Sequence, residues 1–167
     1  MVKVLVRAFE DPNTGSRILL QELLGRPLCL RHDEAGRPVL EAGPFVSLSH
    51  TAGAAAAAIS DHAVGVDLER LRPVRPGVAE RVLSRQEWDW YAGRGRRTED
   101  FLTLWTLKES FYKYLGTGLP GFPNETRFQC REGLWSLDGS DLRFQTMQKD
   151  LLFLAVCAEE QEAEITF

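Results

Sequence analysis

The segment Trp105–Lys113 reads WTLKESFYK and is followed by glycines at positions 116 and 118. Its apolar residues recur at helical spacing, which predicts an amphipathic helix. Glu109 and Lys113 are i,i+4 neighbours on one flank of that helix, whereas Lys108 falls within the apolar stripe. An ammonium group there has to reach an anion beyond the core or extend to water. The segment thus sets one carboxylate and two ammonium groups at fixed spacing.

Upstream of this helix, Gly65–Glu69 reads GVDLE. Apolar residues alternate with Gly65, Asp67 and Glu69, which predicts a strand with one core face and one polar face. Gly65 is expected to leave space beside Asp67. The two carboxylates project from the same face and repel each other, a cost that a bound cation would remove. With Glu109 as a third oxygen donor, we expect a Mg²⁺ site formed by these three acids.

Taken together, GVDLE, WTxKExxxKxxGxG and the earlier Ser49-His50-Thr51 resemble the Sfp-like 4'-phosphopantetheinyl transferases, which load carrier proteins with the arm of coenzyme A. The resemblance runs from about Gly36 to Leu119, and the family's usual N-terminal lobe is longer than the one expected here. It implies an α+β fold of two pseudo-repeated lobes, each an antiparallel sheet packed with helices. We expect a single domain over 1–167, with a short N-terminal lobe over about 1–62 and a C-terminal lobe over about 63–167.

The resemblance also implies an activity. The reaction is transfer of 4'-phosphopantetheine from coenzyme A to a serine of an apo carrier protein, with release of adenosine 3',5'-bisphosphate. Mg²⁺ would neutralise the pyrophosphate, and Asp67 and Glu109 would be catalytic carboxylates, with Glu109 as the base for the serine. Lys113 would stabilise or protonate the leaving phosphate, and Lys108 would add positive potential where coenzyme A binds.

Three further residues are expected to contact coenzyme A. In the family the loop at Ser49 and His50 contacts a phosphate, for which a hydroxyl, an imidazole and free backbone amides are suitable donors. Arg37 matches a family position that carries Lys or Arg and holds the 3'-phosphate. A lone histidine is more often a turn or core residue, but the resemblance favours a ligand role for His50.

The remaining elements follow from local patterns. Residues 54–59 are small and apolar, and helix propensity favours a helix there, but the segment between its flanking turns is short enough that we expect a strand. Ser84 and Glu87 have the spacing of a capping box at the start of a helix. Other predictions are a strand over 2–6, a helix over about 17–24, a strand over 45–48 and a β-meander over 127–158.

Composition and charge limit the partners. With 167 residues, of which 44% are hydrophobic, the chain can bury a core, and it has neither an apolar run long enough for a membrane span nor a signal-peptide pattern. A cytoplasmic monomer is expected. The net charge of −4 argues against nucleic acid binding, yet residues 70–97 contain eight arginines and three acids. This segment is either a docking face for an acidic carrier protein or a solvated surface.

Two other functional classes remain open. A Mg²⁺-dependent phosphohydrolase would use the same carboxylates with water as the nucleophile. A non-catalytic coenzyme A-binding or scaffold protein is favoured by the short N-terminal lobe, because in the family that lobe supplies some contacts to coenzyme A. The pathway of the carrier protein, whether of fatty acid, polyketide or nonribosomal peptide synthesis, does not follow from the sequence.

Overall fold

The computed structural model describes residues 1–118, 123–159 and 162–167, so Leu119, where the resemblance ends, lies outside the described residues. The first part of the chain forms β1 (Val2–Ala8), α1 (Pro12–Leu24), β2 (Leu30–His32), β3 (Pro38–Leu40), β4 (Phe45–Thr51) and β5 (Ala54–Ser60). It is followed by β6 (Val64–Arg70), α2 (Val78–Val82), α3 (Arg85–Gly93), α4 (Thr98–Leu115), a 3₁₀ turn (Pro123–Glu125), β7 (Phe128–Arg131), β8 (Leu134–Leu137), β9 (Arg143–Lys149), β10 (Leu152–Ala158) and β11 (Ala163–Thr166). None of the described helices is long and apolar enough to cross a membrane.

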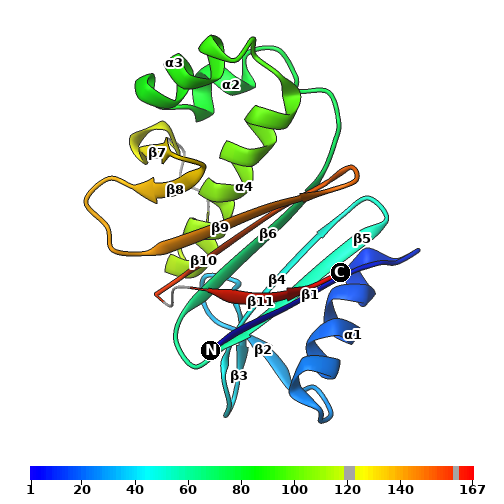
Figure 1. The fold of residues 1–167 in the computed structure, drawn as a ribbon. Coiled ribbons are helices and arrows are strands. Elements are labelled where there is room, and N and C mark those ends of the chain that lie inside the picture. The colour runs from blue at the N-terminus through cyan, green and yellow to red at the C-terminus, as the bar shows by residue number, and fades with distance from the viewer. Residues whose placement is uncertain (119–122, 160–161) are drawn as a thin grey trace.

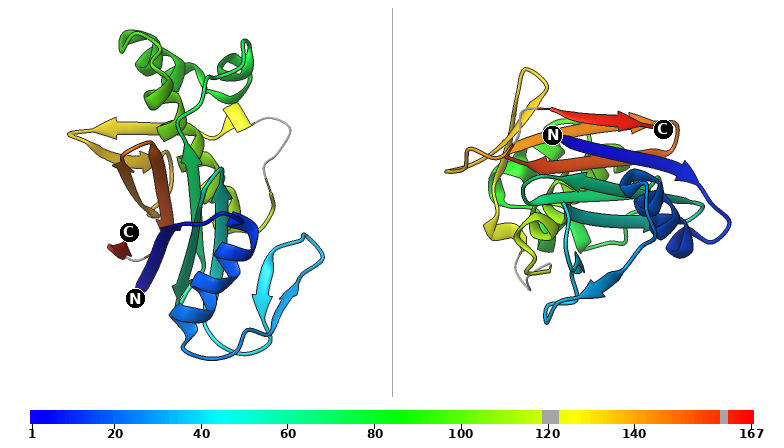
Figure 2. Two further views of the ribbon diagram at one scale, coloured as in Figure 1. Left: turned by 90° about the vertical axis from the view of Figure 1, so that its right-hand side faces the viewer. Right: turned by 90° about the horizontal axis from the view of Figure 1, so that it is seen from below.

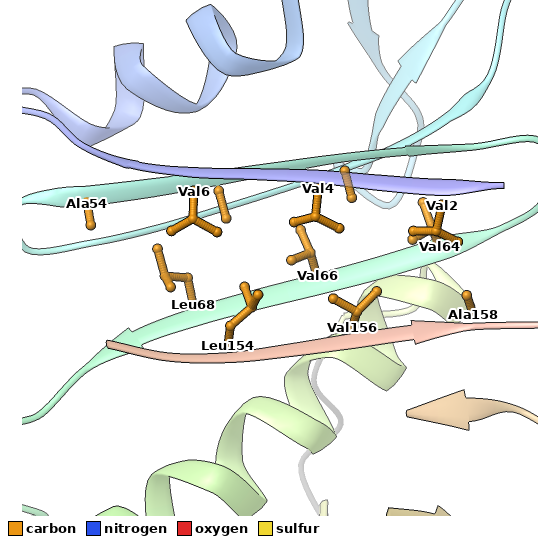
Figure 3. Close-up of a cluster of buried hydrophobic side chains, with 12 residues drawn as sticks. Val2, Val4, Val6, Ala54, Val64, Val66, Leu68, Leu154, Val156 and Ala158 are labelled. Carbon is orange, nitrogen blue, oxygen red and sulfur yellow. The ribbon is translucent and has the colours of Figure 1, made fainter. Parts of the chain in front are cut away.

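Two sheets pack face to face, with a helix on the outer face of each (Figure 1). The strand order is β11-β1-β5-β4 in the first sheet and β6-β10-β9-β8-β7 in the second. Apolar side chains from β1, β5, β6 and β10 point toward one another and form the buried cluster between the sheets (Figure 3). Helix α1 packs on the other face of the first sheet and α4 on the other face of the second, while the β2–β3 hairpin extends away from both (Figure 2).

The two sheets are built by the same succession of elements. A strand (β1 or β6) is followed by a helix (α1 or α4) and a hairpin (β4–β5 or β9–β10), whose second strand pairs antiparallel with the first strand. The predicted α+β fold of two pseudo-repeated lobes is therefore confirmed. Strand β11 was not predicted, and it pairs in parallel with β1, so the first sheet is mixed rather than antiparallel as expected. The division of a single domain near residue 62 remains a proposal.

Residues 54–60 form a strand, as expected against their helix propensity. The reason lies in their neighbours. Strand β5 is hydrogen-bonded to β1 on one side and β4 on the other, and it is covered on both faces. Ala54, Ala56 and Ala58 face the second sheet, whereas Ala55 and Ala57 pack against α1. Small side chains suit a strand enclosed between two closely packed layers.

The observed helices differ from the predicted ones mainly in where they begin. Helix α1 begins at Pro12 rather than near residue 17, because the Asp11 carboxylate accepts hydrogen bonds from the backbone N–H groups of Asn13 and Thr14. The capping box at Ser84 is confirmed, since its hydroxyl accepts from the N–H of Glu87 and the Glu87 carboxylate accepts from the N–H of Ser84. The meander is confirmed as β7 to β10, whereas α2 was not predicted.

Candidate active site

Helix α4 lies directly over the polar face of β6. A Cβ atom on Gly65 would come within 1.8 Å of the carbonyl oxygen of Ser110, so only glycine allows the helix backbone to pass this close. Gly65 therefore admits the helix, whereas the sequence predicted that it leaves space beside Asp67. The close approach brings Glu109 and Lys113 of α4 toward Asp67.

The Asp67 carboxylate is buried, and its two oxygens have different surroundings. Oδ1 accepts hydrogen bonds from Lys113 Nζ at 2.7 Å and from Ser49 Oγ at 2.9 Å. Oδ2 is enclosed and has no hydrogen-bond partner among the described residues. A buried carboxylate oxygen without a partner carries a desolvation cost, which makes it the atom of this site most in need of a ligand.

The other two predicted metal ligands lie in the same electrostatic field. Burial raises the pKa of Glu69 and the Asp67 carboxylate raises it further, while Arg72 and the Trp105 indole N–H oppose this. Trp105 Nε1 donates to Glu69 Oε1 at 3.0 Å. Burial likewise raises the pKa of Glu109 to about 6, with repulsion from Asp67 as the second cause. Asp67 thus destabilises the charged forms of both glutamates.

These side chains are of the kind that binds a divalent cation, although they do not surround a ready-made metal position. In the described ranges of the chain, no three His, Cys, Asp or Glu side chains are gathered into a ready-made metal site. Mg²⁺ does not require one, because it commonly takes one or two carboxylates and completes its octahedron with water and substrate phosphate. Such an ion would give the unpartnered oxygen of Asp67 a ligand, and it would relieve the repulsion that Asp67 exerts on the two glutamates.

Lys108 lies apart from this cluster, which corrects the expectation that it binds coenzyme A. Its side chain is fully buried, and Nζ lies 2.9 Å from the equally buried Glu87 carboxylate. It also donates to the carbonyl oxygens of Pro123 at 3.0 Å and Thr126 at 2.6 Å. The expectation that this ammonium group reaches an anion is met within the protein, so Lys108 joins α4 to α3 and to the segment before β7.

Ser49 belongs to a row of hydroxyl groups that joins the two sheets. Three alternate side chains of β4 each accept a hydrogen bond from a backbone N–H of β6, which is an edge strand of the second sheet among the described residues. The pairs are Ser47 with Val66 at 3.0 Å, Ser49 with Leu68 at 3.1 Å and Thr51 with Arg70 at 3.2 Å. Residues 49–51 therefore form part of a strand, and the expected loop is not present there.

This register sends His50 away from the cluster. Neighbouring side chains of a strand alternate between its faces. Ser49 is paired with Ala56, which faces the second sheet, whereas His50 is paired with Ala55, which packs against α1. His50 is exposed on that opposite face, so the structure does not bring it to Asp67 and Lys113.

Arg37 lines the same hollows of the surface as Lys113. These are two cavities, of about 210 and 270 Å³. Arg37 Nε donates to Asp33 Oδ2 at 3.0 Å. The guanidinium also approaches the end of α4, because a Cβ on Gly116 would lie only 2.6 Å from Arg37 Nη1. Arg37 and Lys113 thus place two cationic groups along adjoining hollows of the surface.

The contacts of two residues in and near the site were not predicted from the sequence. Trp105 is apolar and was given no role in the site, but its spacing of four residues from Glu109 and eight from Lys113 puts all three on one row of the helix. That spacing was a usable signal for a residue that contacts the carboxylates. Glu87 was recognised only as a helix cap, and no local pattern relates it to Lys108.

Comparison with known proteins identifies the family. A sequence model of the 4'-phosphopantetheinyl transferase superfamily matches residues 63–160, more than half of the chain. The chain belongs to this superfamily. The sequence-based expectation of this family is thereby confirmed, and the matched part contains β6 and α4 with the predicted metal ligands.

Curated superfamily members share part of their length with this chain. The 4'-phosphopantetheinyl transferase gsp of Aneurinibacillus migulanus is 31% identical over 94 residues, which cover 55% of this chain and 40% of that protein. The 4'-phosphopantetheinyl transferase Sfp of Bacillus subtilis strain 168 is 27% identical over 129 residues, covering 68% and 58% respectively. The chain therefore spans less than two thirds of the length of these relatives.

A solved structure shows the same superfamily fold. The crystal structure of holo-[acyl-carrier-protein] synthase of Thermotoga maritima superposes with a TM-score of 0.52 and 29% sequence identity, covering 60% of this chain and 64% of that chain. In sequence, the holo-[acyl-carrier-protein] synthase of the same organism is 41% identical over 58 residues, or 35% of this chain and 34% of that protein.

Proposed function

We propose that the protein transfers 4'-phosphopantetheine from coenzyme A to a serine of an apo acyl or peptidyl carrier protein, as a holo-[acyl-carrier-protein] synthase. The observation that carries the proposal is the meeting of Asp67, Glu109 and Lys113 beside cavities that Arg37 also lines. Superfamily membership and the names of the relatives support the same activity.

In this proposal the residues of the cluster act on the transferred group as follows. The serine oxygen forms a bond to the phosphorus next to pantetheine, and the bond from that phosphorus to adenosine 3',5'-bisphosphate breaks. Glu109 accepts the serine proton, and its pKa of about 6 leaves it mostly ionised yet basic enough at neutral pH. Lys113 stabilises the charge that grows on the leaving phosphate, and Arg37 pairs with the 3'-phosphate.

The proposal includes Mg²⁺ bound by Asp67, Glu69 and Glu109 together with substrate oxygens. When bound, the ion supplies charge neutralisation of the pyrophosphate and polarisation of the phosphorus under attack. The partnerless Oδ2 of Asp67 and the raised pKa values of both glutamates support this choice of ligands.

Docking of an acidic carrier protein on residues 70–97 is a further part of the proposal. Several arginines of this segment have partners within the protein: Arg72 pairs with Glu69, and Arg94 and Arg97 both pair with Asp100. Arg85 also meets Asp89, but its side chain is 89% exposed, so its charge remains accessible to a partner. A cytoplasmic monomer is proposed as well, and gel filtration tests its oligomeric state.

The proposal is tested by intact-mass analysis of an apo carrier protein incubated with coenzyme A, Mg²⁺ and the purified protein. The expected result is a phosphopantetheine adduct on the carrier, abolished by chelator. Release of phosphate or nucleotide from coenzyme A without any carrier would instead indicate a phosphohydrolase. Binding of coenzyme A with no adduct on any class of carrier would indicate a scaffold, and either result would contradict the proposal.

A further inference from the structure

The Ser49 hydroxyl uses its full hydrogen-bonding capacity inside the protein. A serine hydroxyl has one proton to donate and two lone pairs to accept with. Ser49 donates to Asp67 Oδ1 at 2.9 Å, and it accepts from the N–H of Leu68 at 3.1 Å and from Lys113 Nζ at 3.0 Å. With its side chain buried and all three positions engaged, Ser49 has no group left for a substrate phosphate.

The backbone holds this hydroxyl in place. Leu68 is adjacent in sequence to Asp67, and its N–H fixes Ser49 Oγ beside the carboxylate. Ser47 and Thr51 make the same contact to β6 on either side, so the position of Ser49 is set by the row of hydroxyl groups that joins the two sheets. Among these three hydroxyl groups, the structure shows a bond to the Asp67 carboxylate from Ser49 alone.

We infer that Ser49 is a positioning residue for Asp67 and Lys113, and that it does not bind coenzyme A. Its hydroxyl and the Lys113 ammonium together hold Oδ1 of Asp67, so Oδ2 is the oxygen left to a divalent cation. Without the hydroxyl, the carboxylate can rotate and present both oxygens to Lys113, which would then compete with the cation. The inference rests on the proposed function, because it describes how the same site is kept ready.

The test compares Ser49→Ala with Thr51→Val. The second substitution removes a hydroxyl group of the same row, for which the structure shows no bond to the Asp67 carboxylate. The first measurement is Mn²⁺ binding followed by electron paramagnetic resonance, without coenzyme A or carrier. Loss of a group that orients a metal ligand commonly costs ~10–100-fold in metal affinity. We expect a decrease of this size for Ser49→Ala, with Thr51→Val close to the wild type.

The second measurement is coenzyme A binding in the presence of chelator, by calorimetry. A positioning residue predicts that the affinity of Ser49→Ala for coenzyme A equals that of the wild type. If coenzyme A binding weakened about tenfold or more, the size expected for loss of a charge-assisted phosphate contact, while Mn²⁺ affinity stayed unchanged, Ser49 would be a substrate contact and the inference would be wrong.

The third measurement separates this inference from the proposed function. In chelator, the changes in Tm caused by Ser49→Ala and Asp67→Ala should not add when the two substitutions are combined, because each removes the hydrogen bond that the two side chains share. The changes caused by Thr51→Val and Asp67→Ala should add. If the wild type modifies no carrier, the proposed function fails, but this cycle still applies. Additive effects for the Ser49 pair would overturn the positioning role whatever the activity.

Discussion

Glu109 retains its proton to a higher pH than an ordinary glutamate, because burial and the Asp67 carboxylate raise its pKa from 4.5 to about 6. Between these values the folded protein binds more protons than the unfolded chain, so the free energy of unfolding should fall as pH rises through this window. Glu109→Gln removes that penalty. The variant should unfold at higher denaturant concentration than the wild type at about pH 7.5, with the difference shrinking below about pH 5.

The same variant should have lost transfer activity, so stability and activity should move in opposite directions. The measurements are urea unfolding in chelator at both pH values and intact-mass analysis of carrier modification. An active Glu109→Gln protein would show that the carboxylate is not the base. A variant less stable than the wild type at the higher pH would show that the carboxylate is not a strained group.

Lys113 contacts Asp67 and Ser49 before any substrate is bound, and its partly exposed side chain lines the two cavities. If it stabilises the leaving phosphate, the charge that it meets grows mainly in the transition state. Lys113→Ala should therefore lower kcat more than it raises KM for coenzyme A. Steady-state kinetics with saturating carrier measure both. A change confined to KM would make Lys113 a ground-state phosphate contact instead.

The close crossing of β6 and α4 depends on a single glycine. Gly65→Ala would push a methyl group into the backbone of the helix at Ser110, which cannot move without displacing Glu109. We expect a loss of stability larger than the ~1–3 kcal/mol typical of an extra methyl group in a packed core. Gly93→Ala is the matched control, because the residue is helical and, among the described residues, its added Cβ would meet nothing within 4 Å beyond the local backbone of its own helix. Thermal unfolding should show destabilisation for the first variant and little change for the second.

Helices α3 and α4 are tied together by the Lys108–Glu87 pair, in which both side chains are fully buried. Desolvation lowers the pKa of Lys108, and the neighbouring Glu87 partly opposes this. Lys108→Met leaves Glu87 buried beside an apolar group and should cost on the order of 3–5 kcal/mol in urea unfolding. The double variant Lys108→Met with Glu87→Gln should recover part of the loss. No recovery would mean that packing, rather than an unpaired charge, accounts for the cost.

At the scale of the whole molecule, surface charge is expected to affect the binding of the carrier protein. An association between the arginines of residues 70–97 and an acidic carrier should weaken as salt rises, because the screening length is only ~10 Å at 0.1 M ionic strength. Reversing Arg81 and Arg85 to Glu should raise KM for the carrier and leave KM for coenzyme A unchanged. Reversing Lys3 and Lys149, which are exposed on β1 and β9, gives the same net charge and should affect neither constant. Equal effects of both variants would indicate that the arginines form a solvated surface and do not dock the carrier.

Much of this molecule could be predicted from local pattern. The helix of α4, the strand of β6 and the capping box at Ser84 each follow from residue spacing, and the family followed from the motifs that these elements carry. The sequence could not show which anion meets Lys108, because Glu87 lies on another helix. It also could not show that His50 faces away from Ser49, since that depends on a strand continuing through residues 49–51.

The pairing of β1 with β11 has a consequence for how the chain folds. Val2 lies beside Ala163, so β1 leaves the ribosome long before β11, the neighbour with which it pairs in parallel, has been made. Contacts between residues so far apart in sequence form slowly, because a long loop has to close before they are gained. During synthesis, β1 can pair with β5 while the edge that later pairs with β11 is still unpaired. That edge is the part of the nascent protein where we expect the longest exposure to chaperones and to other unfinished chains.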